Sequence, residues 1–159
     1  MTFQLQKLIM IFIRITAFIV ICPGFSFKGL PNTFKIGFAI SLTLIINSII
    51  PEIDVIDNMF LFLLLNIKET ILGLALGFVT NLIFSAAEIA GNLVDFQVGF
   101  SMASVYDPSV GTTAANYGKM YYWISISVFF MLDMHHKVIT ALVKSFDYIP
   151  LNTVSFNNY

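Results

Sequence analysis

The sequence predicts an all-α integral membrane protein made of helical hairpins, and three observations carry this prediction. Of its 159 residues, 58% are hydrophobic and only 11% are charged, whereas roughly a quarter of the residues in an ordinary soluble domain are charged. The mean hydropathy is +0.88. Long apolar segments alternate with short loops that carry proline, glycine or charge. A chain of this length would accommodate about four membrane helices of ~20 residues each.

The first apolar segment, residues 8–27, predicts a membrane helix that the protein retains. Arg14 interrupts its hydrophobic region, and no small-x-small cleavage site follows, so it does not match a secretory signal. Pro23 and Gly24 provide helix stop signals. Two later apolar segments, residues 36–50 and 121–132, are each too short to span a bilayer comfortably. Hydropathy alone therefore does not give four clean spans, which indicates hairpins packed inside a larger assembly.

Charge and motifs argue against several classes of function. The net charge is −1, without a basic tail or patch, so nucleic acid is not an expected partner. The sequence contains no G-x-S-x-G, P-loop, C-x-x-C or G-x-G-x-x-G motif. We therefore predict that the chain is not an enzyme and has no catalytic residue and no cofactor.

The segment Asp133–Lys137 contains two adjacent histidines, which raises the question of a metal site. Adjacent residues of a helix point to different faces, unlike the i, i+4 histidine pair of a zinc protease. No third cluster of ligands stands nearby in the sequence. This segment is therefore predicted to be a polar junction before a last amphipathic helix, which Pro150 ends, and no metal site is predicted.

A stripe of polar and small residues runs through residues 59–99, with members recurring every eleven residues. Spacings of three and four place these side chains along one face of a helix. Unbroken, this helix would be about 60 Å long, twice the ~30 Å hydrocarbon core. It must therefore leave the bilayer, break near Gly91 and Asn92, or lie in a protein-lined environment. The stripe comprises Asn66, Glu69, Gly73, Gly77, Asn81, Glu88, Asn92 and Asp95.

The charges of this stripe are expected to face protein or water, because an ionised group facing lipid costs at least ~2.5 kcal/mol. Gly73 and Gly77 are expected to pack helices within the chain. Glu69, Glu88 and Asp95 leave two interpretations open, a proton relay or a subunit interface. Lys68, Glu69 and Glu88 have no obvious partners in the sequence, so the isolated chain is expected to be poorly stable in detergent.

The segment "AGNLVDFQVGFSMASVYDP", residues 90–108, closely resembles the signature of the FliR family, the R-type export-gate subunits of flagellar and injectisome type III secretion systems. A second match is Arg14 followed by "PGFSFKGLPNTFKIGFAI". The positions that match the family there are Arg14, Pro23, Phe25, Pro31 and Lys35. Asn92 and Met134 depart from the family pattern. The resemblance also leads us to expect a further C-terminal helical pair, whereas the sequence ends at Tyr159.

The resemblance implies a multi-pass subunit, residues 1–159 forming one export-gate domain, in the bacterial inner membrane at the base of the flagellar basal body. Its implied partners are P-type and Q-type gate subunits, the lipid bilayer and unfolded exported proteins. A switch protein of the FlhB type is expected too, with the export ATPase and platform proteins as indirect partners. The alternative is a small proton-coupled transporter or channel that uses Glu69, Glu88 and Asp95.

The resemblance also implies a plug that narrows the conduit, formed by the segment after Gln97-x-Gly99. Met102 and Val105 fall at the places of the plugging residues. Pro108 disfavours helical geometry at Asp107, so we expect a pore-facing loop or helix end that closes the channel by apolar contact. The predicted gate residues are Gly99, Phe100, Ser101, Met102, Val105, Tyr106, Asp107 and Pro108.

Overall fold

The computed structural model describes residues 3–26, 31–51, 56, 58–99 and 116–151, and every regular element among them is a helix. The prediction of an all-α protein is thus confirmed for this part of the chain. The helices are α1 (Phe3–Ile21), α2 (Asn32–Ile49), α3 (Met59–Val98), α5 (Asn116–Met131) and α6 (Met134–Tyr148).

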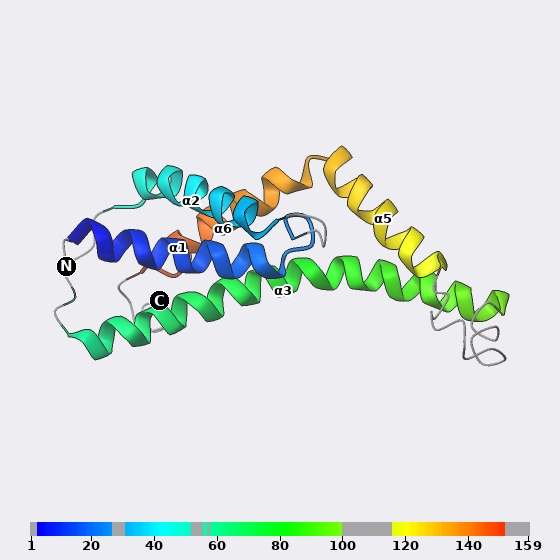
Figure 1. The fold of residues 1–159 in the computed structure, drawn as a ribbon, viewed down its shortest axis with the longest axis horizontal. Coiled ribbons are helices and arrows are strands. Elements are labelled where there is room, and N and C mark those ends of the chain that lie inside the picture. Colours follow the sequence, from blue (N-terminus) through cyan, green and yellow to red (C-terminus); the bar gives the residue numbers. More distant parts are fainter. Residues whose placement is uncertain (1–2, 27–30, 52–55, 57, 100–115, 152–159) are drawn as a thin grey trace.

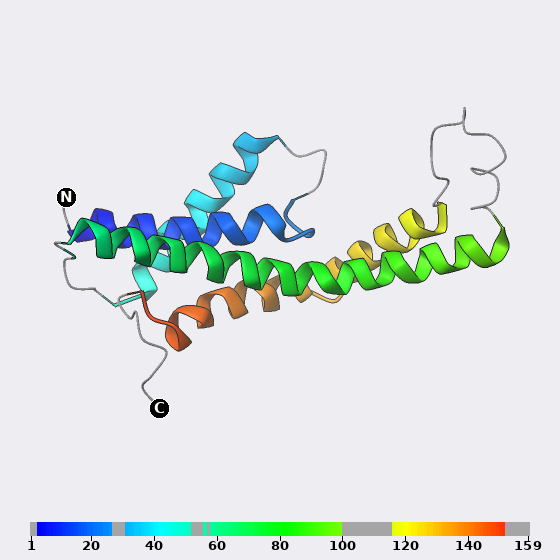
Figure 2. The same ribbon diagram turned by 90° about the horizontal axis from the view of Figure 1, so that it is seen from below.

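Helix α3 is the spine of the molecule (Figure 1). Its 40 residues correspond to a length of about 60 Å. Helix α1 lies along its first half and α5 along its second half, and both views show the same arrangement (Figures 1 and 2). Helix α2 packs on α1, and α6 returns toward the first half of α3. The chain therefore forms two helical packing regions along one long helix.

Residues at both ends of α3 have the types that cap helices. The Asn58 side chain accepts hydrogen bonds from the backbone N–H groups of Phe60 and Leu61, at 2.9 and 3.4 Å, which is the usual role of Asn at this position. Gly99 ends the helix in the left-handed conformation, with φ of 85°. Helix α3 is continuous between these caps, so the option of a break near Gly91 and Asn92 is wrong.

The larger apolar core surrounds α1. Six apolar side chains of α1 are buried together with residues of α2, α3 and α6, which makes α1 the central helix of this half of the molecule: Met10, Ile11, Ile15, Ala17, Phe18 and Ile19. A smaller cluster attaches α5 to the second half of α3, where the rings of Phe84 and Phe129 meet edge to face at a centroid distance of 5.3 Å. The larger core includes Met10, Ile11, Ile15, Phe18, Leu65, Leu142 and Phe146, and the smaller one Phe84, Ile126 and Phe129.

Three of the described helices, α1, α2 and α3, are long and apolar enough to cross a membrane. Helix α2 qualifies because it begins at Asn32, directly after Pro31, so residues 32–35, three of them polar, extend the short apolar segment into 18 helical residues. Helices α5 and α6 together could form a fourth span that bends by 75° at their junction. The sequence predicted that four clean spans would not be found. Among the described helices, only the bent pair of α5 and α6 is not a single straight span.

Candidate functional site

A buried ion pair joins α1 to α3 and α6. The side chains of Arg14 and Glu69 are both completely inaccessible to solvent, and Arg14 Nε lies 2.5 Å from Glu69 Oε2. Arg14 also donates to Ser145 Oγ and to the backbone carbonyl of Ile149, each at 3.0 Å. Its guanidinium carbon lies 4.0 Å from the ring centroid of Phe146. This one side chain thus contacts polar and aromatic groups from three segments of the chain.

Two lysines direct their charge at the carboxyl ends of helices, where unsatisfied carbonyls carry partial negative charge. Lys68 Nζ lies 3.2 Å from Glu69 Oε1 and donates at 2.9 Å to the carbonyl of Pro150, just beyond α6. Lys7 Nζ donates at 2.6 Å to the carbonyl of Ile50, at the end of α2. The expectation that Lys68 and Glu69 lack partners within the chain is therefore wrong, because they pair with each other and with Pro150 and Arg14, which are far away in sequence.

Asp95 makes the complementary contact at the amino end of α5. It is only 3% exposed, and its two carboxylate oxygens accept the backbone N–H groups of Tyr117 and Gly118 at 3.1 and 3.0 Å. A carboxylate is stabilising there, because it satisfies free N–H groups at the positive end of the helix dipole. A methyl group added at Gly91 would lie 2.5 Å from the carbonyl oxygen of Tyr117. Asp95 and Gly91 together allow α3 and α5 to meet at backbone distance.

Gly73 and Gly77 allow the backbones of α1 and α3 to approach each other closely. A Cβ atom on Gly73 would collide with the carbonyl oxygen of Arg14 and with the side chain of Ala17. On Gly77 it would lie 2.9 Å from the carbonyl oxygen of Phe18. The structure thus places both glycines in a helix contact within the chain, beside the ion pair.

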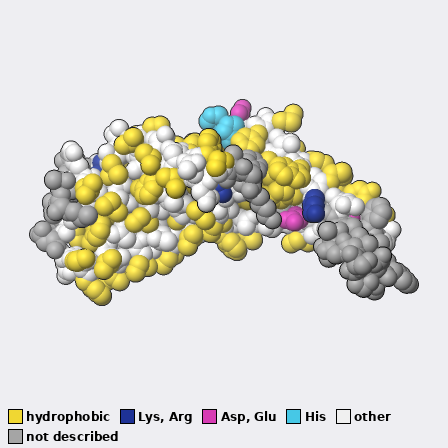
Figure 3. Space-filling view, in the orientation of Figure 1, with side chains coloured by type: hydrophobic (Ala, Val, Ile, Leu, Met, Phe, Trp, Pro, Cys, Tyr) yellow, Lys and Arg dark blue, Asp and Glu magenta, His cyan; other side chains and the backbone are white. Residues whose placement is uncertain are grey.

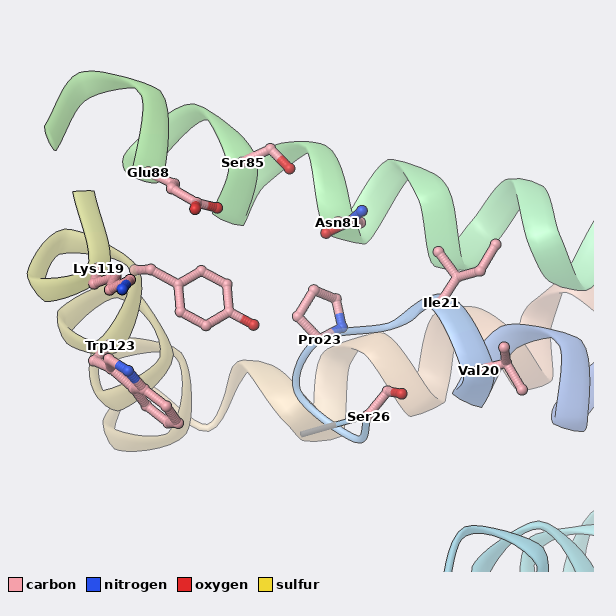
Figure 4. Close-up of a pocket in the computed structure, with 10 residues that line it drawn as sticks. Val20, Ile21, Pro23, Ser26, Asn81, Ser85, Glu88, Lys119 and Trp123 are labelled. Carbon is pink, nitrogen blue, oxygen red and sulfur yellow. The ribbon is translucent and has the colours of Figure 1, made fainter. Parts of the chain in front are cut away.

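The other members of the stripe are more accessible. Asn66 is partly buried and donates to the carbonyl of Phe62, one turn earlier, at 2.9 Å. Asn81 and Glu88 line a cavity of about 600 Å³ between the end of α1 and the α3–α5 hairpin (Figure 4). Glu88 is exposed and forms no ion pair with any described residue, and Asn92 is exposed beside Gly118. The stripe therefore divides into a buried part that packs helices and an accessible part.

The remaining residues that match the family pattern shape the connection between α1 and α2. Pro23 lies in the turn after α1 and lines the cavity. Pro31 immediately precedes α2 with φ of −63°. Lys35 Nζ donates to Ser26 Oγ at 2.9 Å, across this connection.

Of the predicted gate residues, the structure describes Gly99 alone, as the residue that ends α3. Phe100, Ser101, Met102, Val105, Tyr106, Asp107 and Pro108 lie outside the described residues.

The junction of α5 and α6 departs from the sequence-based interpretation. Asp133 adopts the left-handed conformation, with φ of 53°, and its Oδ1 lies 3.7 Å from His136 Nδ1 and 4.0 Å from His135 Nε2. The two imidazole centroids are 4.1 Å apart. The prediction that these histidines point to different faces is therefore wrong. Their rings turn toward each other at the start of α6, and both face Asp133, which lies between the two helices.

These features define a helical membrane protein in which a few buried charges hold the helices together. Its central helix, α3, is longer than the hydrocarbon core of a bilayer is thick. The chain matches bacterial export proteins, family 1, over residues 5–158 and belongs to that family. The resemblance inferred from the motifs is therefore confirmed.

Three curated relatives place this match among flagellar biosynthetic proteins. The chain is 34% identical to flagellar biosynthetic protein FliR of Bacillus subtilis, over 95% of this chain and 58% of the relative. It is 27% identical to flagellar biosynthetic protein FliR of Escherichia coli, over 92% of this chain and 56% of the relative. It is also 27% identical to flagellar biosynthetic protein FliR of Aquifex aeolicus, over 96% of this chain and 58% of the relative. The chain thus spans a little over half the length of these relatives.

Proposed function

We propose that this chain is a membrane subunit of a bacterial type III protein export apparatus, where it forms part of the conduit for unfolded substrates. Its membership of the bacterial export family and its similarity to flagellar biosynthetic proteins support this proposal. In the proposal it lies in the inner membrane, at the base of the flagellar basal body. Its direct partners there are P-type and Q-type gate subunits.

The observation that carries the proposal is the apolar surface along the whole of α3. Large hydrophobic side chains are exposed from its first turn to its last, over about 60 Å, whereas the hydrocarbon core of a bilayer is only ~30 Å thick. Lipid can therefore cover about half of this surface. An apolar patch outside lipid marks a protein interface, so other subunits are needed. The exposed residues include Phe60, Leu63, Ile67, Ile71, Phe78, Ile83, Ile89, Leu93 and Phe96.

The placement of the acids argues against a proton relay. Glu69 is held by Arg14, and Asp95 is held by two backbone N–H groups of α5. Glu69 and Glu88 are nineteen residues apart on one continuous helix, which corresponds to about 28 Å. A proton cannot pass directly between carboxylates at that separation. Glu69 and Asp95 serve instead as fixed counter-charges at helix contacts.

Affinity purification from native membranes tests the proposed function. We expect the chain to co-purify with P-type and Q-type gate proteins, and we expect liposomes that contain the chain alone to show no solute or proton flux. Flux by the chain alone, without co-purifying gate proteins, would support the transporter alternative and overturn the proposal.

We further propose that residues 99–108 close the conduit, with Met102 and Val105 as the sealing side chains. The match of "QVGFSMASVYDP" to the family signature supports this assignment, as does the adaptable packing of methionine. A hydrophobic constriction can exclude ions by dewetting.

Replacing Met102 and Val105 with Ala should leave assembly intact but allow ions to leak across the membrane, because the smaller side chains widen the constriction. Ion permeability and growth are measured in cells that express the variant together with its partner subunits. The matched control replaces Met120 and Val98, which are exposed on α5 and α3, with Ala. If the assembled Met102/Val105 variant is as impermeable as the control, these two residues do not form the seal.

A further inference from the structure

Three metal-ligating side chains gather at the bend between α5 and α6, where Figure 3 shows the histidines beside an acidic side chain on the outer edge of the molecule. One ligand atom from each of Asp133, His135 and His136 lies within 4.8 Å of the other two. The Asp133 and His136 side chains are 77% and 72% exposed, so the described residues do not enclose them.

The carboxylate of Asp133 is available for such a role. Asp133 occupies the position before the first turn of α6, yet its side chain makes no capping hydrogen bond there. An aspartate at this position ordinarily accepts a backbone N–H. Its Oδ1 faces the two imidazoles instead, 3.7 and 4.0 Å from their nearer nitrogens.

We propose that Asp133, His135 and His136 form a binding site for a divalent transition metal, with Zn²⁺ as the best match. Imidazole nitrogen and carboxylate oxygen are zinc ligands. Bonds of about 2.0–2.1 Å in a tetrahedral site place the donor atoms about 3.3 Å apart. Asp133 Oδ1 lies about 0.4 Å farther than that from His136 Nδ1 and about 0.7 Å farther from His135 Nε2. Small rotations of the exposed Asp133 and His136 side chains, with a small shift of the partly buried His135 ring, can remove this excess. Water would complete the coordination.

The electrostatics of the bend give Asp133 a second role in this site. The amino end of α6 carries partial positive charge, which opposes a bound cation. The carboxylate offsets that charge and supplies the anionic ligand. The bound metal would connect the residue that breaks the helix to the first turn of α6 and so hold the 75° bend.

Metal titration of the 159-residue chain tests this site. The protein is purified without a polyhistidine tag, treated with chelator, and titrated with ZnCl₂ by calorimetry; Co²⁺ absorption provides a second readout of tetrahedral coordination. We expect one Zn²⁺ per chain. His135→Ala and His136→Ala should each weaken binding by at least about tenfold, since even changes beside a metal ligand cost about 10–100-fold in affinity. The double variant should not bind.

Two further substitutions separate ligand loss from altered folding. Asp133→Asn keeps a residue that tolerates the left-handed conformation but removes the anionic ligand, so it should also weaken Zn²⁺ binding. Asp147→Asn removes an exposed carboxylate near the other end of α6 and should bind Zn²⁺ as the parent does. Circular dichroism checks that all variants retain their helices. Absence of saturable Zn²⁺ binding, or binding that persists in the double histidine variant, would overturn the proposal.

Discussion

Replacing Arg14 with Met is expected to destabilise the chain by about 3–5 kcal/mol, because removing one partner of a buried ion pair leaves the other charge without compensation. Glu69 would keep Lys68 at 3.2 Å, but it would lose the guanidinium that contacts it inside the protein. The hydrogen bonds from Arg14 to Ser145 and to the Ile149 carbonyl would also be lost. The free energy of unfolding in detergent measures the effect.

A double-mutant cycle isolates the pair. Glu69→Leu alone should also be strongly destabilising, whereas Arg14→Met combined with Glu69→Leu should recover part of the loss, because replacing both charges with apolar groups is often close to neutral. Lys144→Met removes an exposed cation of α6 and serves as the control. If Arg14→Met costs no more than Lys144→Met, the ion pair does not hold α1, α3 and α6 together.

Two alanine substitutions at helical glycines are expected to have opposite effects. Gly73→Ala should destabilise the chain by about 1–3 kcal/mol or more, because the new Cβ meets the backbone of Arg14, which has no rotamer to change. Gly37→Ala should stabilise it by up to about 1 kcal/mol, because no atom lies within 4 Å of the added Cβ and Gly37 is inside α2. Denaturant unfolding in detergent measures both.

Equal effects of the two substitutions would contradict the close approach of α1 and α3. The same geometry predicts the effect of Gly77→Leu. Because Gly77 faces the backbone of Phe18, that variant should weaken the chain's own fold before it encounters another subunit.

Much of the fold could be predicted from local signals. Hydropathy placed the apolar helices, Pro23 and Pro150 marked two helix ends, and the polar segment after Leu132 marked the bend. The start of α2 could not be placed in this way, because Asn32, Thr33 and Lys35 are polar and yet belong to the helix that follows Pro31. Periodicity also gave a single stripe on α3, although α1 and α5 cover different halves of that helix.

The buried polar contacts were less predictable, since each depends on residues far apart in the chain. Arg14 and Glu69 are separated by fifty-five positions. Gln6 exchanges two hydrogen bonds with the backbone of Ile56, at 3.1 and 3.2 Å, and nothing in the sequence pattern singles it out. The histidines at the bend were misassigned because helix periodicity gives the direction of Cβ and not the reach of the imidazole ring.

Site-specific photo-crosslinking at Phe60 and Phe96 tests the central claim, that other protein subunits cover part of α3. The two side chains are 69% and 70% exposed and lie thirty-six residues apart on one helix, about 54 Å, so a ~30 Å hydrocarbon core cannot cover both. With a photoreactive residue at each position in living cells, we predict discrete protein adducts from at least one of them and none from buried Phe84. Absence of protein adducts from both Phe60 and Phe96 would contradict the claim.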